Sequence, residues 1–387
     1  MVEADFESQR RVLLLAGDLE VRGRTMGLLR LAELLPDRGY LALVACSNRS
    51  RVSARQRRDL EILEYGGLDG HLMGSLVRRF LAHDLADVPP DLVHVQSLDL
   101  VPVAEWLSQK WGVPVVVSVS EVQSGTRRLR RARQSSCVAR VLAVSQAVAD
   151  SLVDLGGVSA DRIVVVPSGV AVPRVDRLVS VLDPEHVPVF GTAGPLETIK
   201  GLPYFLGAAQ KVLAAGRDAE FLVAGSGPEE DNLRRLAGEL GIRERVTFLP
   251  NRPDFSDALG AVDVFCLPSL QQGLGTIMLE AMSLGRPVIA SDVGGIYSVV
   301  RDGETGLAVT PEDSGQLARQ MIALLDDPVR ARALGEAGRI EVTERFGVER
   351  MIDQVVEVYD GLLQTDTSNG LDTSTPLNAA HEERDSR

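Results

Sequence analysis

The sequence predicts an α/β protein built from two doubly wound domains that face a cleft. Continuous apolar runs alternate with stretches of helical periodicity along most of the 387 residues, a pattern typical of buried parallel strands joined by helices. The alternation is broken at residues 172–187, where Pro173, Pro184 and mixed charges favour an inter-domain linker. A chain of this length also exceeds the size of one ordinary hydrophobic core.

In the N-terminal half, strand, loop and helix repeat from residue 11 onward. Strands are predicted at residues 11–16, 40–46, 92–95, 113–119, 138–144 and 163–166, and helices at 26–35, 103–111 and 145–155. We expect Ser145 to be the N-cap of the last helix, because its hydroxyl can accept a hydrogen bond from a free amide of the first turn. These elements form the predicted N-terminal domain, residues 11–172, after a flexible arm at residues 1–10.

The C-terminal half resumes the alternation after the linker, residues 173–188. Strands are predicted at residues 189–191, 220–224, 246–249, 287–290 and 306–309 and from residue 262, and helices at 202–215, 229–240, 314–325 and 328–345 and after Gly275. This second domain spans residues 189–347, and a further helix is predicted at 348–363. The polar residues 364–387 are predicted to be disordered.

Composition excludes several classes of protein. The formal net charge of −13 argues against a nucleic-acid binder, because that role requires a basic face. No apolar run reaches the roughly 18 residues of a membrane span, and the N-terminal residues lack the apolar core of a secretion signal. The 3 cysteines and 5 histidines show no metal-ligand spacing, so we expect a reduced, cytoplasmic protein without a metal or other cofactor.

Three glycine turns follow strands of the C-terminal half, at Gly194, Gly225 and residues 273–275. Glycine lets the backbone approach a phosphate closely, and the helix after such a turn offers free amides and a positive dipole end. Lys200 can add a point charge on a phosphate, and Glu280 can accept hydrogen bonds from sugar hydroxyls. One such turn alone is ordinary strand-to-helix chemistry, but three with a lysine and an acid favour a nucleotide phosphate.

Residues 189–361 resemble the donor-binding half of the retaining GT-B glycosyltransferases of family 4. The matching stretches are GTAGPLETIKG from residue 191, FLVAGSGPEEDNLRRLAGELGIRERVTFLP from 221, PSLQQGLGTIMLEAMSLGRPVIASDVGG from 268 and VRDGETGLAV from 300. The N-terminal half is similar more loosely, through DLVHVQS, GVPVVVSVS and RVLAVSQAVADSLVDLGG. The resemblance covers residues 11–363 and implies two Rossmann-like domains in the GT-B arrangement.

The resemblance implies roles for individual residues. Lys200, Gln272 and Glu280 would stand at catalytic positions, with Lys200 on the donor diphosphate and Glu280 on the donor ribose. The other donor-binding residues would be Gly23, Gly194, Gly225, Leu249, Pro250, Gly273, Leu274, Gly275 and Thr276. The helix at 348–363 would cross back onto the N-terminal domain. By the same resemblance, the anomeric configuration would be retained and no metal required.

Four positions depart from the family's pattern. Gln272 replaces the first acid of a Glu-x7-Glu motif and lacks the charge that stabilises an oxocarbenium-like sugar. Pro195 replaces a diphosphate-binding arginine, so a guanidinium and a backbone donor are both lost. Ser120 replaces a histidine at the end of a strand, and Arg22 replaces the second glycine of an N-terminal glycine pair.

Two weaker features lie in the N-terminal half. The arginine clusters at residues 127–133 and 51–58 are either a peripheral contact with the inner face of an anionic membrane, near a lipid-linked acceptor, or solvated helix faces. His94 ends an apolar strand. It is either an acceptor-side residue, together with Ser120, or a buried structural histidine.

The leading interpretation is a glycosyltransferase that moves a sugar from a nucleoside diphosphate-sugar to a carbohydrate or lipid-linked acceptor, in cell-envelope or polysaccharide biosynthesis. The alternative is a catalytically degenerate protein of the same fold that serves as a binding or scaffold subunit, since Gln272, Pro195 and Ser120 replace site residues. A dinucleotide-dependent oxidoreductase is disfavoured, because GDLEVRG after the first strand lacks G-x-G-x-x-G.

Overall fold

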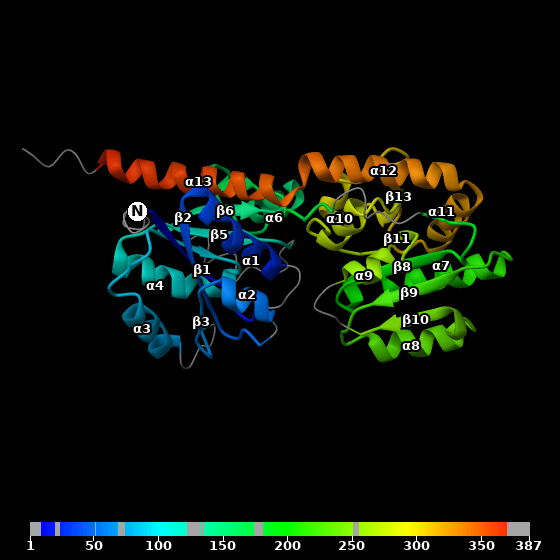
Figure 1. Cartoon of the computed structure of the whole chain (residues 1–387), viewed down its shortest axis with the longest axis horizontal. Helices are drawn as coiled ribbons and strands as arrows, with labels where there is room; N and C mark the ends of the chain where they lie inside the picture. Colours follow the sequence, from blue (N-terminus) through cyan, green and yellow to red (C-terminus); the bar gives the residue numbers. More distant parts are fainter. Residues whose placement is uncertain are drawn as a thin grey trace, which may run out of the picture.

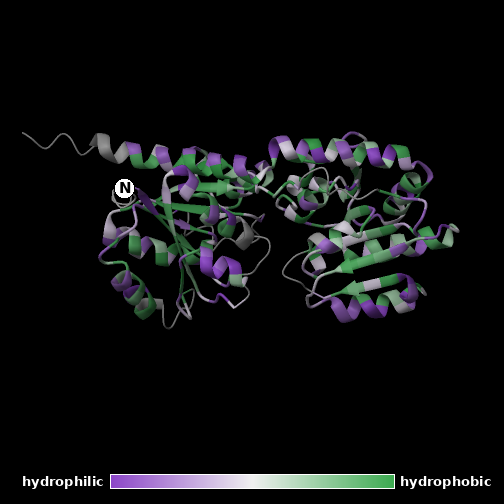
Figure 2. Cartoon of the chain, viewed as in Figure 1, coloured by the Kyte–Doolittle hydropathy of each residue, from purple (hydrophilic) through white to green (hydrophobic). Residues whose placement is uncertain are grey.

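In the computed structural model, two α/β domains lie side by side (Figure 1). The structure describes residues 9–19, 24–50, 52–68, 74–121, 133, 135–173, 181–250 and 255–369. Within these ranges each domain contains one parallel sheet with helices on its faces, so the predicted pair of doubly wound domains is confirmed. Figure 2 shows hydrophobic residues along the strands of both sheets and many hydrophilic ones on the outer helices.

The N-terminal sheet has the order β3-β2-β1-β4-β5-β6-β7 among the described residues. Its strands are β1 (Arg10–Leu15), β2 (Tyr40–Cys46), β3 (Ile62–Glu64), β4 (Leu92–Val95), β5 (Val115–Val119), β6 (Val138–Ala143) and β7 (Ile163–Val165). Its helices are α1 (Arg24–Leu34), α2 (Ala54–Asp59), α3 (Gly74–Asp84), α4 (Val101–Trp111) and α6 (Gln146–Asp154). The sequence did not predict β3, α2 or α3. The strand was missed because it has only 3 residues and lies at the sheet edge.

The C-terminal sheet has the order β10-β9-β8-β11-β12-β13 in the part of the chain that is described. Its strands are β8 (Val189–Ala193), β9 (Glu220–Ala224), β10 (Val246–Leu249), β11 (Val264–Leu267), β12 (Val288–Ser291) and β13 (Leu307–Val309). Its helices are α7 (Leu202–Ala214), α8 (Glu230–Glu239), α9 (Ser256–Gly260), α10 (Thr276–Ser283), α11 (Ser314–Asp326) and α12 (Pro328–Arg345). The short helix α9 was not predicted.

The last helix, α13 (Val348–Asn369), lies along the N-terminal domain although it follows the C-terminal one in sequence (Figure 1). The hydroxyl of Tyr359 is fully buried and lies 2.5 Å from Nδ1 of His94, whose Nε2 lies 2.8 Å from Oγ of Ser118. The ring of Tyr40 packs edge-on against Tyr359 with centroids 5.6 Å apart. A buried hydrogen-bonded chain therefore fastens α13 to β4 and β5.

This helix is longer than predicted. It runs to Asn369, six residues beyond the predicted end at 363, because neither proline nor glycine interrupts residues 362–369. The remainder of the predicted disordered tail, residues 370–387, and most of the predicted arm, residues 1–8, lie outside the described residues.

The chain passes between the domains twice, and the two crossings pair with each other. The amide of Val170 donates to the carbonyl of Phe346 at 2.9 Å, and the amide of Val348 donates to the carbonyl of Val170 at 3.0 Å. A Cβ atom on Gly169 would lie 2.6 Å from Cα of Val348, so the close approach requires glycine. The buried carboxylate of Asp263 fixes the end of the first crossing by accepting amide hydrogen bonds at 2.7 and 2.8 Å.

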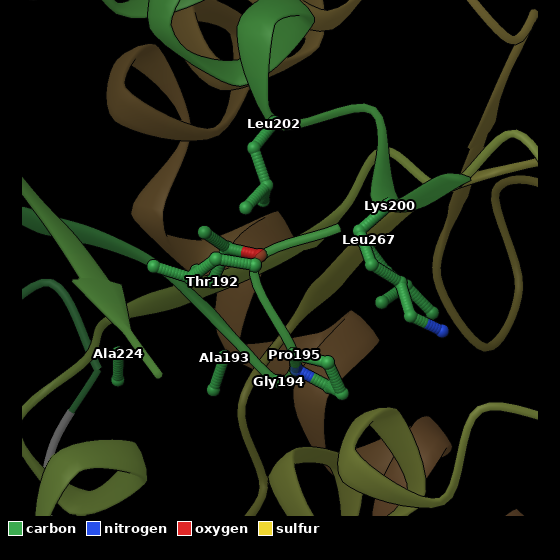
Figure 3. Close-up of a pocket in the computed structure, with 9 residues that line it drawn as sticks. Thr192, Ala193, Gly194, Pro195, Lys200, Leu202, Ala224 and Leu267 are labelled. Carbon is green, nitrogen blue, oxygen red and sulfur yellow. The ribbon is translucent and has the colours of Figure 1, made fainter. Parts of the chain in front are cut away.

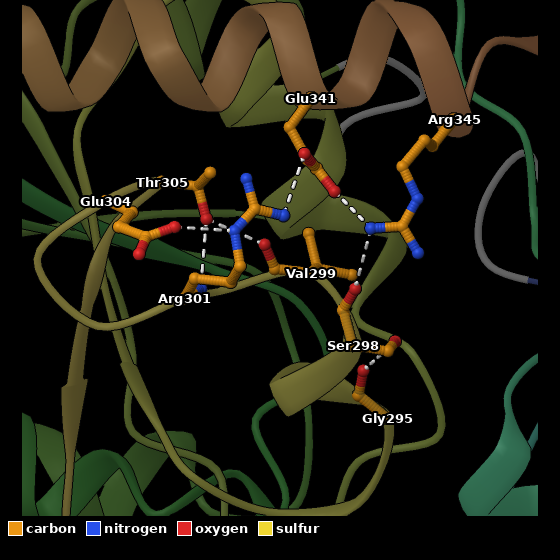
Figure 4. Close-up of polar contacts among 8 residues, drawn as sticks. All are labelled: Gly295, Ser298, Val299, Arg301, Glu304, Thr305, Glu341 and Arg345. Atoms are coloured by element: carbon orange, nitrogen blue, oxygen red, sulfur yellow. Dashed lines mark hydrogen bonds and ion pairs between the residues drawn. The ribbon is translucent and has the colours of Figure 1, made fainter.

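A polar network connects the second crossing to the C-terminal domain (Figure 4). Glu341, near the end of α12, forms ion pairs with Arg301, at 2.9 Å, and with Arg345. Arg345 also donates to the carbonyl of Ser298 at 3.4 Å, and Oγ of Ser298 donates to the carbonyl of Gly295 at 2.6 Å. The end of α12 is thereby connected to the turn at Gly295.

The two domains touch where the loop before α10 meets the N-terminal domain. Oγ of Ser145 donates to the carbonyl of Gly273 at 2.7 Å and accepts from the amide of Val148 at 3.3 Å, which confirms the predicted N-cap. A Cβ atom on Gly273 would lie 2.0 Å from the carbonyl oxygen of Ser120, and one on Gly295 would lie 1.9 Å from the carbonyl oxygen of Gly273. Neither glycine position has space for a side chain.

Substitution of Gly295 should test this contact. Gly295→Ala places a methyl group against backbone rather than against a flexible side chain, so we expect the inter-domain contact to open and stability to fall by about 1–3 kcal/mol. A lower Tm and faster amide exchange in residues 270–296 would show it. Gly238→Ala, on α8, is the matched control because a Cβ atom there meets nothing within 4 Å. Equal behaviour of the two variants would contradict the contact.

Burial of His94 predicts a pH-dependent stability of the N-terminal domain. Burial lowers the pKa of His94 to about 3, whereas its pKa in the unfolded chain is about 6.5. The stabilisation is therefore complete above pH 6.5 and is lost as the pH falls, by about 2 kcal/mol between pH 7 and pH 5. Urea unfolding, followed through the fluorescence of Trp106 and Trp111 on α4, measures it. His94→Gln should remove this component, and an unchanged pH dependence would contradict the burial.

Candidate active site

A small pocket opens at the carboxyl ends of β8, β9 and β11 (Figure 3). It is lined by Thr192, Ala193, Gly194, Pro195, Leu196, Lys200, Leu202, Ala224 and Leu267. In the sheet order, β8 lies between β9 and β11, so the connection that follows β8 leads to β9 on one side and the one that follows β11 leads to β12 on the other. Open parallel sheets bind their ligands at such a switch point.

Lys200 and Gln272 meet beside this pocket. Lys200 ends a 3-10 turn, and the carbonyl of Ile199 in that turn accepts a hydrogen bond from the amide of Leu270 at 2.8 Å. Nζ of Lys200 donates to Oε1 of Gln272 at 3.0 Å, and Oγ of Ser269 donates to the same oxygen at 3.3 Å. The structure thus brings together two predicted catalytic residues that are 72 positions apart in the sequence.

The charge of Lys200 is only partly balanced by its own domain. Burial lowers the pKa of Lys200, while the nearby carboxylates of Glu121 and Glu197 raise it. Glu197 immediately precedes the turn that carries Lys200, whereas Glu121 belongs to the N-terminal domain. The hydrogen-bond partner of the ammonium, Gln272, is neutral. A half-buried cation in this setting is suited to bind an anion.

The glycine turns near this lysine contain glycine for different structural reasons. A Cβ atom on Gly225 would lie 1.9 Å from the carbonyl oxygen of Gly194, so glycine at 225 is required by packing of the two turns. Gly275 has a φ of 91° and precedes α10 without a side-chain cap. The first amides of α10, beginning at Thr276, therefore form an uncapped helix N-terminus, which favours anions.

The remaining C-terminal candidates lie along the same edge of the sheet. Glu280 is half-buried in the second turn of α10, and Leu274 is buried in the loop before that helix. Leu249 ends β10, and its carbonyl accepts a hydrogen bond from the amide of Gly225 at 2.9 Å. Pro250 follows it and is exposed.

The N-terminal candidates are placed differently. His94 is buried in the core with both ring nitrogens bonded, so it holds α13 and does not line the cleft. Ser120 lies at the inter-domain contact, and its buried Oγ has no hydrogen-bond partner among the residues that the structure describes. Gly23, Arg22 and most of the arginine cluster at 127–133 lie outside the described residues.

Two features of the site were not predicted from the sequence. Glu121 follows Ser120 at the carboxyl end of β5, the edge where parallel sheets bind ligands, and that position was the available signal. Ser145 was predicted as a helix cap, but its second hydrogen bond, across to Gly273, follows only from how the domains are placed. Both residues lie where the N-terminal domain meets the loop before α10. We call this surface, formed by Ser120, Glu121 and Ser145, the N-terminal wall of the site.

Neither a metal cluster nor a membrane-spanning helix occurs in the described part of the chain. There, no cluster of three or more His, Cys, Asp or Glu side chains is arranged to hold a metal ion. Among the same residues, no helix combines the length and the apolar character needed to span a bilayer.

Comparison with known proteins supports the resemblance. Residues 21–174 match the family model Glycosyltransferase Family 4, and residues 187–327 match the model Glycosyl transferases group 1. The D-inositol 3-phosphate glycosyltransferase of Acidothermus cellulolyticus is 30% identical over 72% of this chain and 69% of its own length. The alpha-D-kanosaminyltransferase of Streptomyces kanamyceticus is 30% identical over 44% of this chain and 45% of its length. The chain thus spans about half the length of some relatives that it matches.

Solved structures share the arrangement of the two domains. Anabaena HepE, in complex with UDP and glucose, has a TM-score of 0.80 at 20% identity and covers 92% of this chain and 100% of its own. Sucrose-phosphate synthase from Thermosynechococcus elongatus has a TM-score of 0.78 at 21% identity, with coverages of 92% and 100%. The chain has the GT-B fold and belongs to the group 1, or family 4, glycosyltransferases.

Proposed function

We propose that the protein transfers a sugar from a nucleoside diphosphate-sugar to an acceptor held by the N-terminal domain. The observation that carries this proposal is the hydrogen bond of 3.0 Å between Lys200 and Gln272, at the sheet's switch point and close to the N-terminus of α10. A relative from Corynebacterium glutamicum, 36% identical over 45% of this chain and 47% of its own length, is named a GDP-mannose-dependent mannosyltransferase. HepE binds UDP and glucose.

In the proposed reaction, the bond between the anomeric carbon and the diphosphate oxygen breaks, and its electron pair leaves on the diphosphate. Lys200 and the first amides of α10 stabilise that developing charge, while Glu280 binds the donor ribose. The proposal includes retention of the anomeric configuration and independence of metal and other cofactors. Metal independence is supported by the positive charge that Lys200 and the N-terminus of α10 provide beside the pocket.

The acceptor, in this proposal, is a carbohydrate or a lipid-linked molecule that enters along the N-terminal wall. That wall reaches the loop before α10 directly, through Ser120 and Ser145, so an acceptor bound there meets the donor sugar. Arg55, Arg57 and Arg58 on α2 are exposed and offer a contact for an anionic membrane surface. They would place the protein at the inner face of the membrane.

A second candidate function is binding without turnover, in a catalytically degenerate subunit. The specific observation in its favour is that Oε1 of a neutral amide, Gln272, accepts the hydrogen bond from Lys200 where the family's pattern places a carboxylate. Pro195 lines the pocket where that pattern places an arginine. Turnover distinguishes the two functions, because donor binding is expected in both.

Donor binding should depend on Lys200. We expect at least one of UDP-glucose, UDP-N-acetylglucosamine and GDP-mannose to raise the Tm of the protein. Lys200→Met should weaken that binding about 10- to 100-fold, since a hydrogen bond to a charged group contributes about 1.5–3 kcal/mol. Glu280→Ala should weaken it as well. Lys211→Met, on the exposed side of α7, is the matched control and should bind like the wild type. If none of these nucleotide sugars binds, the transferase proposal is wrong.

Turnover should not require restoration of the family's residues. We expect the wild type to release nucleoside diphosphate from its preferred donor, and Gln272→Glu with Pro195→Arg to change that rate by less than about 10-fold, or 1.4 kcal/mol. Coupled detection of free UDP or GDP measures both rates. A wild type that binds donor without release, together with a restored variant that turns over, would favour the degenerate subunit.

A further inference from the structure

Glu121 lies on the N-terminal wall, against the loop that carries Gln272. β5 ends at Val119, so Ser120 and Glu121 emerge from the carboxyl edge of the N-terminal sheet. A Cβ atom built on Gly273 would lie 2.0 Å from the carbonyl oxygen of Ser120 and 3.4 Å from Cα of Glu121. The backbones of the two segments are therefore in contact, and Gln272 directly precedes the contacted glycine.

The charges around this contact come from opposite domains. On the C-terminal side, Lys200 donates to the neutral Gln272, whose oxygen also accepts from Ser269. On the N-terminal side, the exposed carboxylate of Glu121 is near enough to raise the pKa of Lys200. Ser120, the residue before Glu121, has a buried Oγ without a hydrogen-bond partner among the described residues. An acid that acts on Lys200 and follows the segment in contact with the Gln272 loop thus belongs to the other domain.

We propose that Glu121 is an acidic residue of this site, a carboxylate that the N-terminal domain places opposite Lys200, facing the transferred sugar, in place of the charge that Gln272 lacks. This inference rests on the proposed glycosyl transfer and adds a residue to it. Glu121 contributes both to the position of the sugar and to the field across the cleft. It acts together with Lys200.

The chemistry assigned to Glu121 is electrostatic. As the anomeric carbon–oxygen bond breaks, positive charge develops on the sugar ring, and a fixed carboxylate stabilises it. The acceptor oxygen forms the new bond to the anomeric carbon, and its proton passes to the departing diphosphate oxygen. Glu121 forms no covalent bond and is unchanged at the end, so atoms and charges balance without a further reactant.

The first test needs no turnover and asks whether Glu121 faces Lys200 in solution. The chain has three lysines, Lys110, Lys200 and Lys211, so reductive methylation with a ¹³C label gives resolvable signals. Glu121→Gln should lower the titration midpoint of Lys200 and leave those of Lys110 and Lys211 unchanged. An unchanged Lys200 would overturn the inference, whatever the activity.

The second test removes the carboxylate from position 121 and places one at position 272. Glu121→Gln should lower kcat for donor turnover about 10- to 100-fold while the donor Kd stays near the wild-type value. Adding Gln272→Glu to that variant should recover most of the loss, because it returns a carboxylate to the sugar from the other wall. Glu197→Gln is the matched control: it also removes an acid near Lys200, but an exposed one from the C-terminal domain, and should keep kcat close to wild type.

These outcomes separate the two proposals. A wild type that turns over donor while Glu121→Gln keeps full kcat would overturn the role of Glu121 and leave the transferase function standing. A loss in Glu121→Gln that Gln272→Glu does not recover would show that shape rather than charge matters, which also overturns it. A wild type that binds no nucleotide sugar would overturn the proposed function, while the titration of Lys200 would still decide the placement of Glu121.

Discussion

The carbonyl oxygen of Gly273 is the contact on which the arrangement of the site depends. It accepts a hydrogen bond from the hydroxyl of Ser145 in the N-terminal domain and packs directly over Gly295 of its own domain. The facing backbone of Ser120 fills the remaining side of the glycine. Because Gly273 meets Ser120 and Gly295 through backbone atoms and Ser145 through a hydrogen bond, the loop with Gln272 is positioned by both domains at once. The geometry of the site is therefore tied to the relative placement of the domains.

The electrostatics of the site follow from that placement. Lys200 is held by Gln272 in the C-terminal domain, and Glu121 comes from the N-terminal domain. Glu121 is thus an acid that the N-terminal domain adds to those that the C-terminal domain already holds near Lys200 and on α10. A cation and an acid on facing walls create a field across the cleft, which favours a ligand with a negative end and an end that becomes positive during reaction. A neutral residue at 272 is compatible with that arrangement.

The fold was largely predictable because a buried parallel strand is a continuous apolar run, which can be read locally. β3, with 3 residues, and α9, with 5, were missed because such short elements carry no periodicity. Lys200 and Gln272 were identified by their motifs, but the hydrogen bond between them joins loops after different strands. The place of Glu121 after β5 could have been noted from the sequence, but its approach to the Gln272 loop is a contact between domains, which no local pattern records.

The position of α13 has a consequence for biosynthesis. Met351, Ile352, Val355 and Tyr359 belong to the same hydrophobic core as β1 and β2. These side chains are translated after the whole C-terminal domain, whereas the strands that they cover are translated before it. The N-terminal domain must therefore emerge with part of its apolar surface uncovered, and it can complete its core only after the whole C-terminal domain has been translated. We expect the N-terminal domain, although it is translated first, to need the protection of chaperones until α13 has been translated.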